Sequence, residues 1–178
     1  MEAIQDLAPF VQGGMNKVKT QQVVDWVGFD EERMEQLVEL FVAGPWRVTQ
    51  SCAWPLSVIA EKHTALVLPH LETLVQKAAD PQQHVAVKRN VIRLLQFVEL
   101  PEHLLGIVAE LCFNTLSNAS EAVAPRVFSM TVLLHICQQL PELREELQLI
   151  IEDHLPYGTA GFQSRGRKVL KALARLGG

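Results

Sequence analysis

The sequence contains few of the features that mark a membrane-spanning, disulfide-bonded or β-sheet protein. It has no uncharged apolar run of about 18 residues, so no transmembrane helix is predicted. Its first residues, MEAIQDLAPF, include two acids and no basic group, and they do not resemble a signal peptide. Only three cysteines occur and none forms a CxxC pair, which argues against a disulfide framework or a zinc site and fits a reducing cytoplasm. The hairpin turns Asn-Gly and Asp-Gly are absent.

What the sequence does contain is a succession of amphipathic helical segments separated by glycine, proline and capping residues. The tetrapeptides LPEH (100–103) and LPEL (140–143) lie 40 residues apart, and each opens a helix that follows a long apolar one. A period near 40 residues with two helices in each repeat is typical of HEAT and armadillo solenoids. We therefore expect an all-α fold, a right-handed α–α superhelix of about four helical hairpins with an N-terminal helical cap.

The expected boundaries divide a single domain, residues 1–178, into a cap and four repeats. The cap covers residues 1–28, with helical segments at 2–11 and 19–28, and the repeats cover about 30–62, 64–99, 102–139 and 142–176. Each repeat consists of a first helix followed by a second helix. The first helices are expected at 30–43, 64–78, 102–118 and 142–155, and the second helices at 46–62, 81–99, 121–139 and 159–175.

Four stretches, RVTQSCAWPLS, AVKRNVIRLLQF, FSMTVL and IIEDHLPYGTAGFQSRGRKVLK, resemble a family of short bacterial HEAT-like proteins found mainly in Bacteroidetes. The resemblance extends over nearly the whole chain from about residue 18. It implies that the first helices form a convex layer and that the second helices line a concave face. Members are sometimes labelled adenylosuccinate lyase, but that lyase family is much longer and uses a serine-rich loop containing Met-Pro-x-Lys. No methionine here precedes a proline, so the label gains no support from these residues.

The charges separate by helix type although the net charge is only −4. The four first helices carry 13 acidic and 3 basic residues, whereas the four second helices carry 11 basic and 3 acidic residues. A concave surface of one sign concentrates potential and attracts the opposite charge. We therefore expect a basic concave face on the second helices, made by Arg47, Gln50, Trp54, Lys88, Arg89, Arg93, Arg126, Ser129, Arg165 and Lys168.

The same cations have a structural interpretation that the sequence leaves open. They could pair with acids of neighbouring first helices and form ladders between repeats, although exposed pairs contribute only about 0–1 kcal/mol each. A binding role is favoured slightly because Arg47, Lys88 and Arg165 lie in or near the first turns of their helices. Cations at that end oppose the helix dipole, so structural needs alone would not favour this placement.

Motifs that would indicate catalysis are missing from the sequence. There is no HExxH, no phosphate-binding glycine loop and no histidine or carboxylate cluster with metal spacing, so no metal or cofactor is expected. The predicted function is a non-enzymatic cytoplasmic scaffold that binds an acidic protein or peptide segment. The alternative is nucleic-acid binding, possibly with DNA-glycosylase-like activity. The acids of the second helices, Glu61, Glu99 and Glu121, all fall at helix ends, which leaves that alternative without an obvious catalytic carboxylate.

Overall fold

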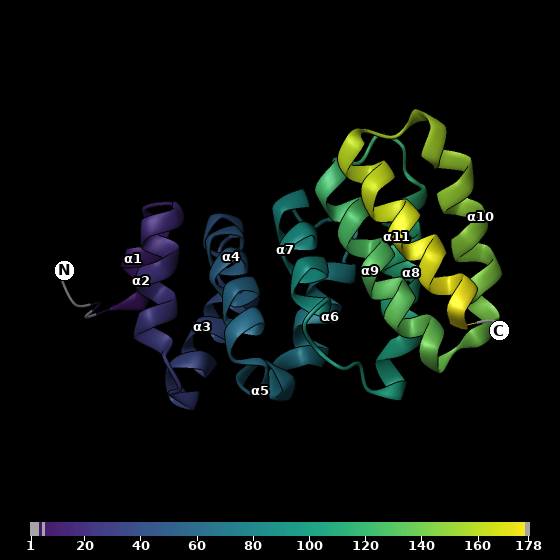
Figure 1. Cartoon of the computed structure of the whole chain (residues 1–178). Helices are drawn as coiled ribbons and strands as arrows, with labels where there is room; N and C mark the ends of the chain where they lie inside the picture. Colours follow the sequence, from purple (N-terminus) through teal and green to yellow (C-terminus); the bar gives the residue numbers. More distant parts are fainter. Residues whose placement is uncertain (1–3, 5, 177–178) are drawn as a thin grey trace. The chain divides into compact units, whose positions relative to one another are not determined.

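The computed structural model describes residue 4 and residues 6–176, and these residues form helices and loops with no strand (Figure 1). This confirms the predicted all-α helical-repeat class. The chain divides into two compact units, with the boundary between Val98 and Glu99. We describe each unit by itself, and the single continuous domain over residues 1–178 stays a prediction.

Unit 1 consists of two helical hairpins preceded by two short helices. Its elements are α1 (Leu7–Gln12), α2 (Lys17–Val27), α3 (Glu31–Ala43), α4 (Trp46–Lys62), α5 (Thr64–Val67), the 3-10 turn η1 (Leu68–His70), α6 (Leu71–Ala79) and α7 (Val85–Leu95). In Figure 1, α4 stands between α2 and α7, and it packs against both of them as well as against α1 and α3. The second helices thus form one layer, and α3 packs against α6 in the other.

Local sequence explains most of the helix ends in unit 1. Asp30 caps α3, because its carboxylate accepts a hydrogen bond from the Arg33 amide at 3.0 Å. Met34, Leu37 and Phe41 recur at helical spacing on α3 and are fully buried. The first helix expected at 64–78 is broken into α5, η1 and α6, because Pro69 lacks an amide donor. The expected helix at 2–11 is α1, although its predicted residues 2, 3 and 5 lie outside the described residues.

The helix expected at 81–99 is wrong at both ends, since α7 spans only Val85–Leu95. Asp80 would be the N-cap of a helix that begins at residue 81. Its carboxylate instead accepts hydrogen bonds from the Gln82 amide at 2.9 Å and the Gln83 side chain at 3.0 Å, which closes a local turn. His84 then becomes the N-cap, with its Nδ1 accepting from the Ala86 amide at 3.1 Å.

Unit 2 contains two further hairpins arranged in two layers. Its elements are α8 (Glu102–Ser117), α9 (Val123–Gln139), the 3-10 turn η2 (Pro141–Leu143), α10 (Arg144–His154), the 3-10 turn η3 (Leu155–Tyr157) and α11 (Ala160–Leu176). The helix α9 packs against both α8 and α11. A Cβ at Gly166 would lie 2.8 Å from Leu155 and 3.1 Å from Ile151, so this glycine permits the close approach of α11 to α10.

The three cysteines are free and buried. Cys52 lies in α4, Cys112 in α8 and Cys137 in α9. Burial raises the pKa of Cys52 and of Cys112 to about 12, and that of Cys137 to about 11, because a thiolate loses hydration in an apolar environment. These thiols therefore pack as small apolar side chains.

Candidate binding site

The helices α4 and α7 of unit 1 lie side by side and run in the same direction. At their N-terminal ends, the Trp46 and His84 rings stack with centroids 6.0 Å apart and an interplanar angle of 27°. Towards their C-terminal ends, Arg93 Nη2 lies 2.7 Å from Glu61 Oε2. Since contacts join both ends, two helix N-termini are brought together at one edge of the unit.

Five of the predicted site residues lie on the unburied sides of these two helices. On α4, Arg47, Gln50 and Trp54 follow at spacings of three and four residues and are exposed or half-buried. On α7, Arg89 and Arg93 lie one turn apart. We call Arg47, Gln50, Trp54, Arg89 and Arg93 the α4–α7 face.

Two arginines of the α4–α7 face, Arg47 and Arg89, form no ion pair with an acid in the part of the chain that the structure describes. The Arg47 guanidinium lies 5.1 Å from the centroid of the Trp46 ring, a cation–π contact at the surface. Arg89 is exposed. Among the described residues, no carboxylate forms an ion pair with either of them. Their charges are therefore available to a ligand.

Arg93 differs from these two, because the structure gives it an acidic partner. Its side chain is 26 % exposed, and it donates to Glu61 at 2.7 Å and to the Ser57 hydroxyl at 3.0 Å. The ladder interpretation thus holds at this position, with one change: the acid belongs to the neighbouring second helix α4 and not to a first helix. Arg93 joins α4 to α7.

The N-terminal edge of the two helices is hollowed by a cavity of about 380 Å³. Its lining includes Trp46, a residue that is 59 % exposed, together with His84, Lys77 and Asp80. Lys77 donates to the Val42 carbonyl at 2.8 Å. The hydrogen bonds from Gln83 and Gln82 lower the pKa of Asp80, and the nearby Lys77 and Lys88 add a smaller effect in the same direction. Asp80 is thus held as a carboxylate within its own turn.

Lys88 lies on a different side of α7 from Arg89. It is half-buried, and its charge acts on Asp80, although the two groups do not form an ion pair. Lys88 therefore belongs to the edge near the cavity and not to the α4–α7 face.

In unit 2, the structure removes two residues from the predicted site. Arg126 and Ser129 are buried, because α9 is covered by α8 on one side and α11 on another. Arg126 donates from Nε to the Leu116 carbonyl at 3.0 Å, and its guanidinium lies 4.5 Å from the Phe162 ring centroid. It therefore closes the C-terminal end of α8 inside the unit.

The other two predicted residues of unit 2 lie on α11. Arg165 is half-buried and donates to the Thr131 hydroxyl of α9 at 2.9 Å, so it connects two second helices. Lys168 is exposed. Both are described with unit 2 and are not counted in the α4–α7 face.

A comparison of the chain with models of protein families agrees with this arrangement of paired helices. The family model of the HEAT repeat domain matches residues 11–173, which is most of the chain. The chain belongs to the HEAT repeat domain family. Comparisons with curated proteins and with solved structures gave no match.

Within this HEAT repeat domain, His84 is the site residue that sequence reasoning missed. A helix predicted from residue 81 would have placed His84 in its first turn, whereas it is the N-cap and stacks on Trp46. In the part of the chain that the structure describes, no group of three or more His, Cys, Asp or Glu side chains is placed to hold a metal ion. No helix of these residues has the length and apolar character needed to cross a membrane.

Proposed function

We propose that this HEAT repeat domain is a non-enzymatic cytoplasmic scaffold, and that its α4–α7 face binds an acidic segment of another protein. The observation that carries the proposal is the position of Arg47 and Arg89. They stand on the exposed sides of two adjacent helices, and no carboxylate of the described residues is paired with them.

The backbone adds to the attraction for anions at the N-terminal edge of this face. The N-terminus of a helix carries a partial positive charge, and here two such ends lie together. The N-cap of α4 is Pro45, which offers no side-chain acceptor to the first amides of the helix. An acidic side chain of a partner would be attracted by these amides and by Arg47. The exposed Trp46 ring offers an apolar contact beside them.

The ion pair between Glu61 and Arg93 supports a binding role over a catalytic reaction on the bases of a nucleic acid. Glu61 is the carboxylate on the exposed side of α4, and Arg93 engages it at 2.7 Å. A carboxylate committed to a structural ion pair is a poor candidate for a catalytic base. The missing lyase loop argues in the same direction against adenylosuccinate cleavage.

The test is fluorescence anisotropy with three labelled probes: a glutamate-rich peptide, a serine-glycine peptide of equal length, and a short DNA duplex. We expect only the acidic peptide to bind well, with an affinity that falls as salt rises. The double variant Arg47→Glu, Arg89→Glu should weaken binding about tenfold or more. Each reversal removes up to about 1 kcal/mol of attraction and adds repulsion.

The matched control reverses two exposed cations of α11, Lys171→Glu and Arg175→Glu, and should leave binding nearly unchanged. Thermal unfolding of both variants should match the wild type, because exposed charges rarely change stability by more than about 0.5 kcal/mol. Equal losses in the two double variants would mean that net charge alone attracts the peptide, and the site would be rejected. Preference for the duplex over the acidic peptide would favour the nucleic-acid alternative.

A further inference from the structure

The outer side of α10 in unit 2 carries an exposed leucine surrounded by acids. The helix packs against α8, α9 and α11 and buries Leu147 and Ile151. Helical spacing places Leu149 on the opposite side, where it is 59 % exposed. Four exposed acids lie three or four residues from Leu149 and therefore border it: Glu145, Glu146, Glu152 and Asp153. We call Leu149 and these four acids the α10 face.

The negative charge of the α10 face is not neutralised within the part of the chain that the structure describes. No cation of these residues forms an ion pair with any of the four acids. Arg144, the arginine of α10, donates to the Cys137 carbonyl at 3.1 Å and to the Leu176 carbonyl at 2.7 Å, so it is bound to the backbone of α9 and α11. The ring of His154 packs against Phe162, with centroids 6.4 Å apart.

Two of these acids do not stabilise α10 itself. Glu145 and Glu146 lie in the first turn, where a carboxylate is favourable. Glu152 and Asp153 lie in the last turn, where the helix end carries a partial negative charge and opposes them. A contact with cations would remove this repulsion, and it would also take Leu149 out of water.

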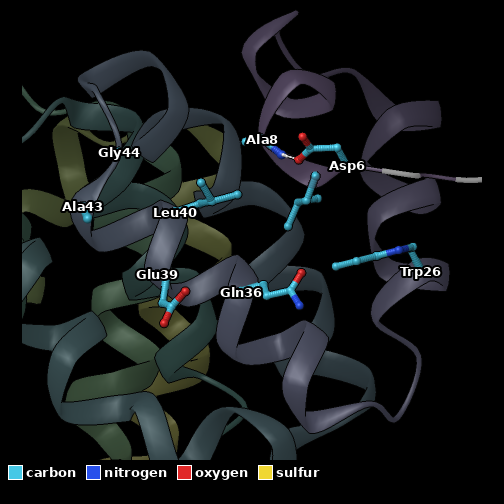
Figure 2. Close-up of a pocket in the computed structure, with 9 residues that line it drawn as sticks. Asp6, Ala8, Trp26, Gln36, Glu39, Leu40, Ala43 and Gly44 are labelled. Carbon is cyan, nitrogen blue, oxygen red and sulfur yellow. Dashed lines mark hydrogen bonds between the residues drawn. The ribbon is translucent and has the colours of Figure 1, made fainter.

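The acid-rich helix of unit 1, α3, has no comparable face. Among the described residues, the exposed large apolar side chains include Leu149 but none from α3. The surface of α3 is instead hollowed by a cavity of about 420 Å³, whose lining includes Gln36, Glu39 and Leu40 (Figure 2). An apolar side chain ringed by acids therefore distinguishes α10 from α3.

The α4–α7 face has the complementary arrangement of charged and apolar groups. Trp46 and Val85 are the first residues of α4 and α7, and both are exposed. Arg47 follows Trp46, and Arg89 lies one turn after Val85. Two cations without an acidic partner in the described residues thus stand beside two exposed apolar side chains.

The spacing of the groups also agrees. Glu145 and Glu152 are seven residues apart, which is about 10 Å along a helix. The axes of packed helices such as α4 and α7 lie about 8–10 Å apart. A helix laid across α4 and α7 can therefore bring one acid to each arginine, with Leu149 between them.

We propose that the acidic segment bound by the α4–α7 face is the α10 face of a second copy of this chain. The inference rests on the function proposed above and names its partner. The contact joins two different surfaces, so it is heterologous, and every copy contributes one surface of each kind.

The test is sedimentation velocity of the full chain over a range of concentrations. The average mass should rise with concentration at low salt and fall towards that of one copy at high salt. The face variant, Arg47→Glu with Arg89→Glu, and the α10 variant, Glu152→Lys with Asp153→Lys, should each associate about tenfold more weakly or less. An equimolar mixture of the two variants should associate again, because one retains the α10 face and the other retains the α4–α7 face.

The matched control, Glu35→Lys with Glu39→Lys, reverses two exposed acids of α3 and changes the net charge by the same amount. It should associate like the wild type. Leu149→Ala should weaken association by about three- to tenfold, because it removes apolar area from the contact. Equal losses in the α3 and α10 variants, or a mixture of variants that stays unassociated, would overturn the proposal.

The glutamate-rich peptide separates failure of this inference from failure of the proposed function. The α10 variant should bind that peptide at least as tightly as the wild type does, because its α4–α7 face is intact. A wild type that binds the peptide but keeps the mass of one copy at every concentration would overturn self-association and leave the proposed function standing. A wild type that binds neither the peptide nor a second copy would overturn both.

Discussion

Replacing Arg126 by alanine should destabilise unit 2 by about 2–3 kcal/mol. The variant loses a charged donor to the Leu116 carbonyl, and a buried hydrogen bond of this kind is worth about 1.5–3 kcal/mol. It also loses the contact with the Phe162 ring, worth about 0.5–2 kcal/mol. These losses are partly offset because the guanidinium itself is costly to bury. Its Nη2 forms no hydrogen bond within the described residues, and burial lowers the pKa of Arg126.

Urea unfolding followed by far-ultraviolet circular dichroism measures this change. Arg126→Met keeps most of the apolar stem, so it should lose only about 1 kcal/mol. Arg167→Met is the matched control, because this exposed guanidinium of α11 donates to the Gln163 side chain and, within the described residues, to no other group. It should change stability by less than about 0.5 kcal/mol. If Arg126→Ala unfolded with the wild-type free energy, the view that Arg126 is a buried structural residue would be refuted.

The remaining predictions concern packing and an ion pair. Gly166→Ala should destabilise the protein by about 1–3 kcal/mol, because the added methyl would lie 2.8 Å from Leu155. Gly106→Ala should instead stabilise the protein by about 0.5–1 kcal/mol, because Gly106 lies in α8 with open space around it. Similar melting temperatures for these two variants would contradict the packing of α10 against α11. A double-mutant cycle of Arg93→Ala and Glu61→Ala should give a coupling of about 0.5–1 kcal/mol, and zero coupling would show that the pair does not join α4 to α7.

Most of the helices could be predicted because their signals are local. The spacing of Met34, Leu37 and Phe41 indicates both a helix and its buried side, and Asp30 marks where that helix begins. The 40-residue period then gives the repeat class, since stacked hairpins are the way such helices bury their apolar sides.

The predictions were wrong where distant residues decide whether a side chain is buried, or where competing local hydrogen bonds decide where a helix begins. The start of α7 was misplaced because the Asp80 carboxylate closes a turn and leaves capping to His84. The burial of Arg126 depends on Phe162, which lies 36 residues further along the chain. The position of Arg126 on an apolar helix, directly after Pro125, was the available signal that this arginine packs inside. The residues of the α4–α7 face lie on two adjacent helices. That this face is a binding surface remains a prediction.

The three buried cysteines can report how often the helices around them open locally. A thiol with a raised pKa inside the core reacts with a maleimide or a disulfide reagent only after the helices around it separate. Cys52 lies in unit 1, whereas Cys112 and Cys137 lie in unit 2. Variants that keep a single cysteine would therefore turn the rate of labelling into a free energy of opening for each unit, without any added probe. Such measurements would show whether a ligand on the α4–α7 face protects only the repeats that it touches.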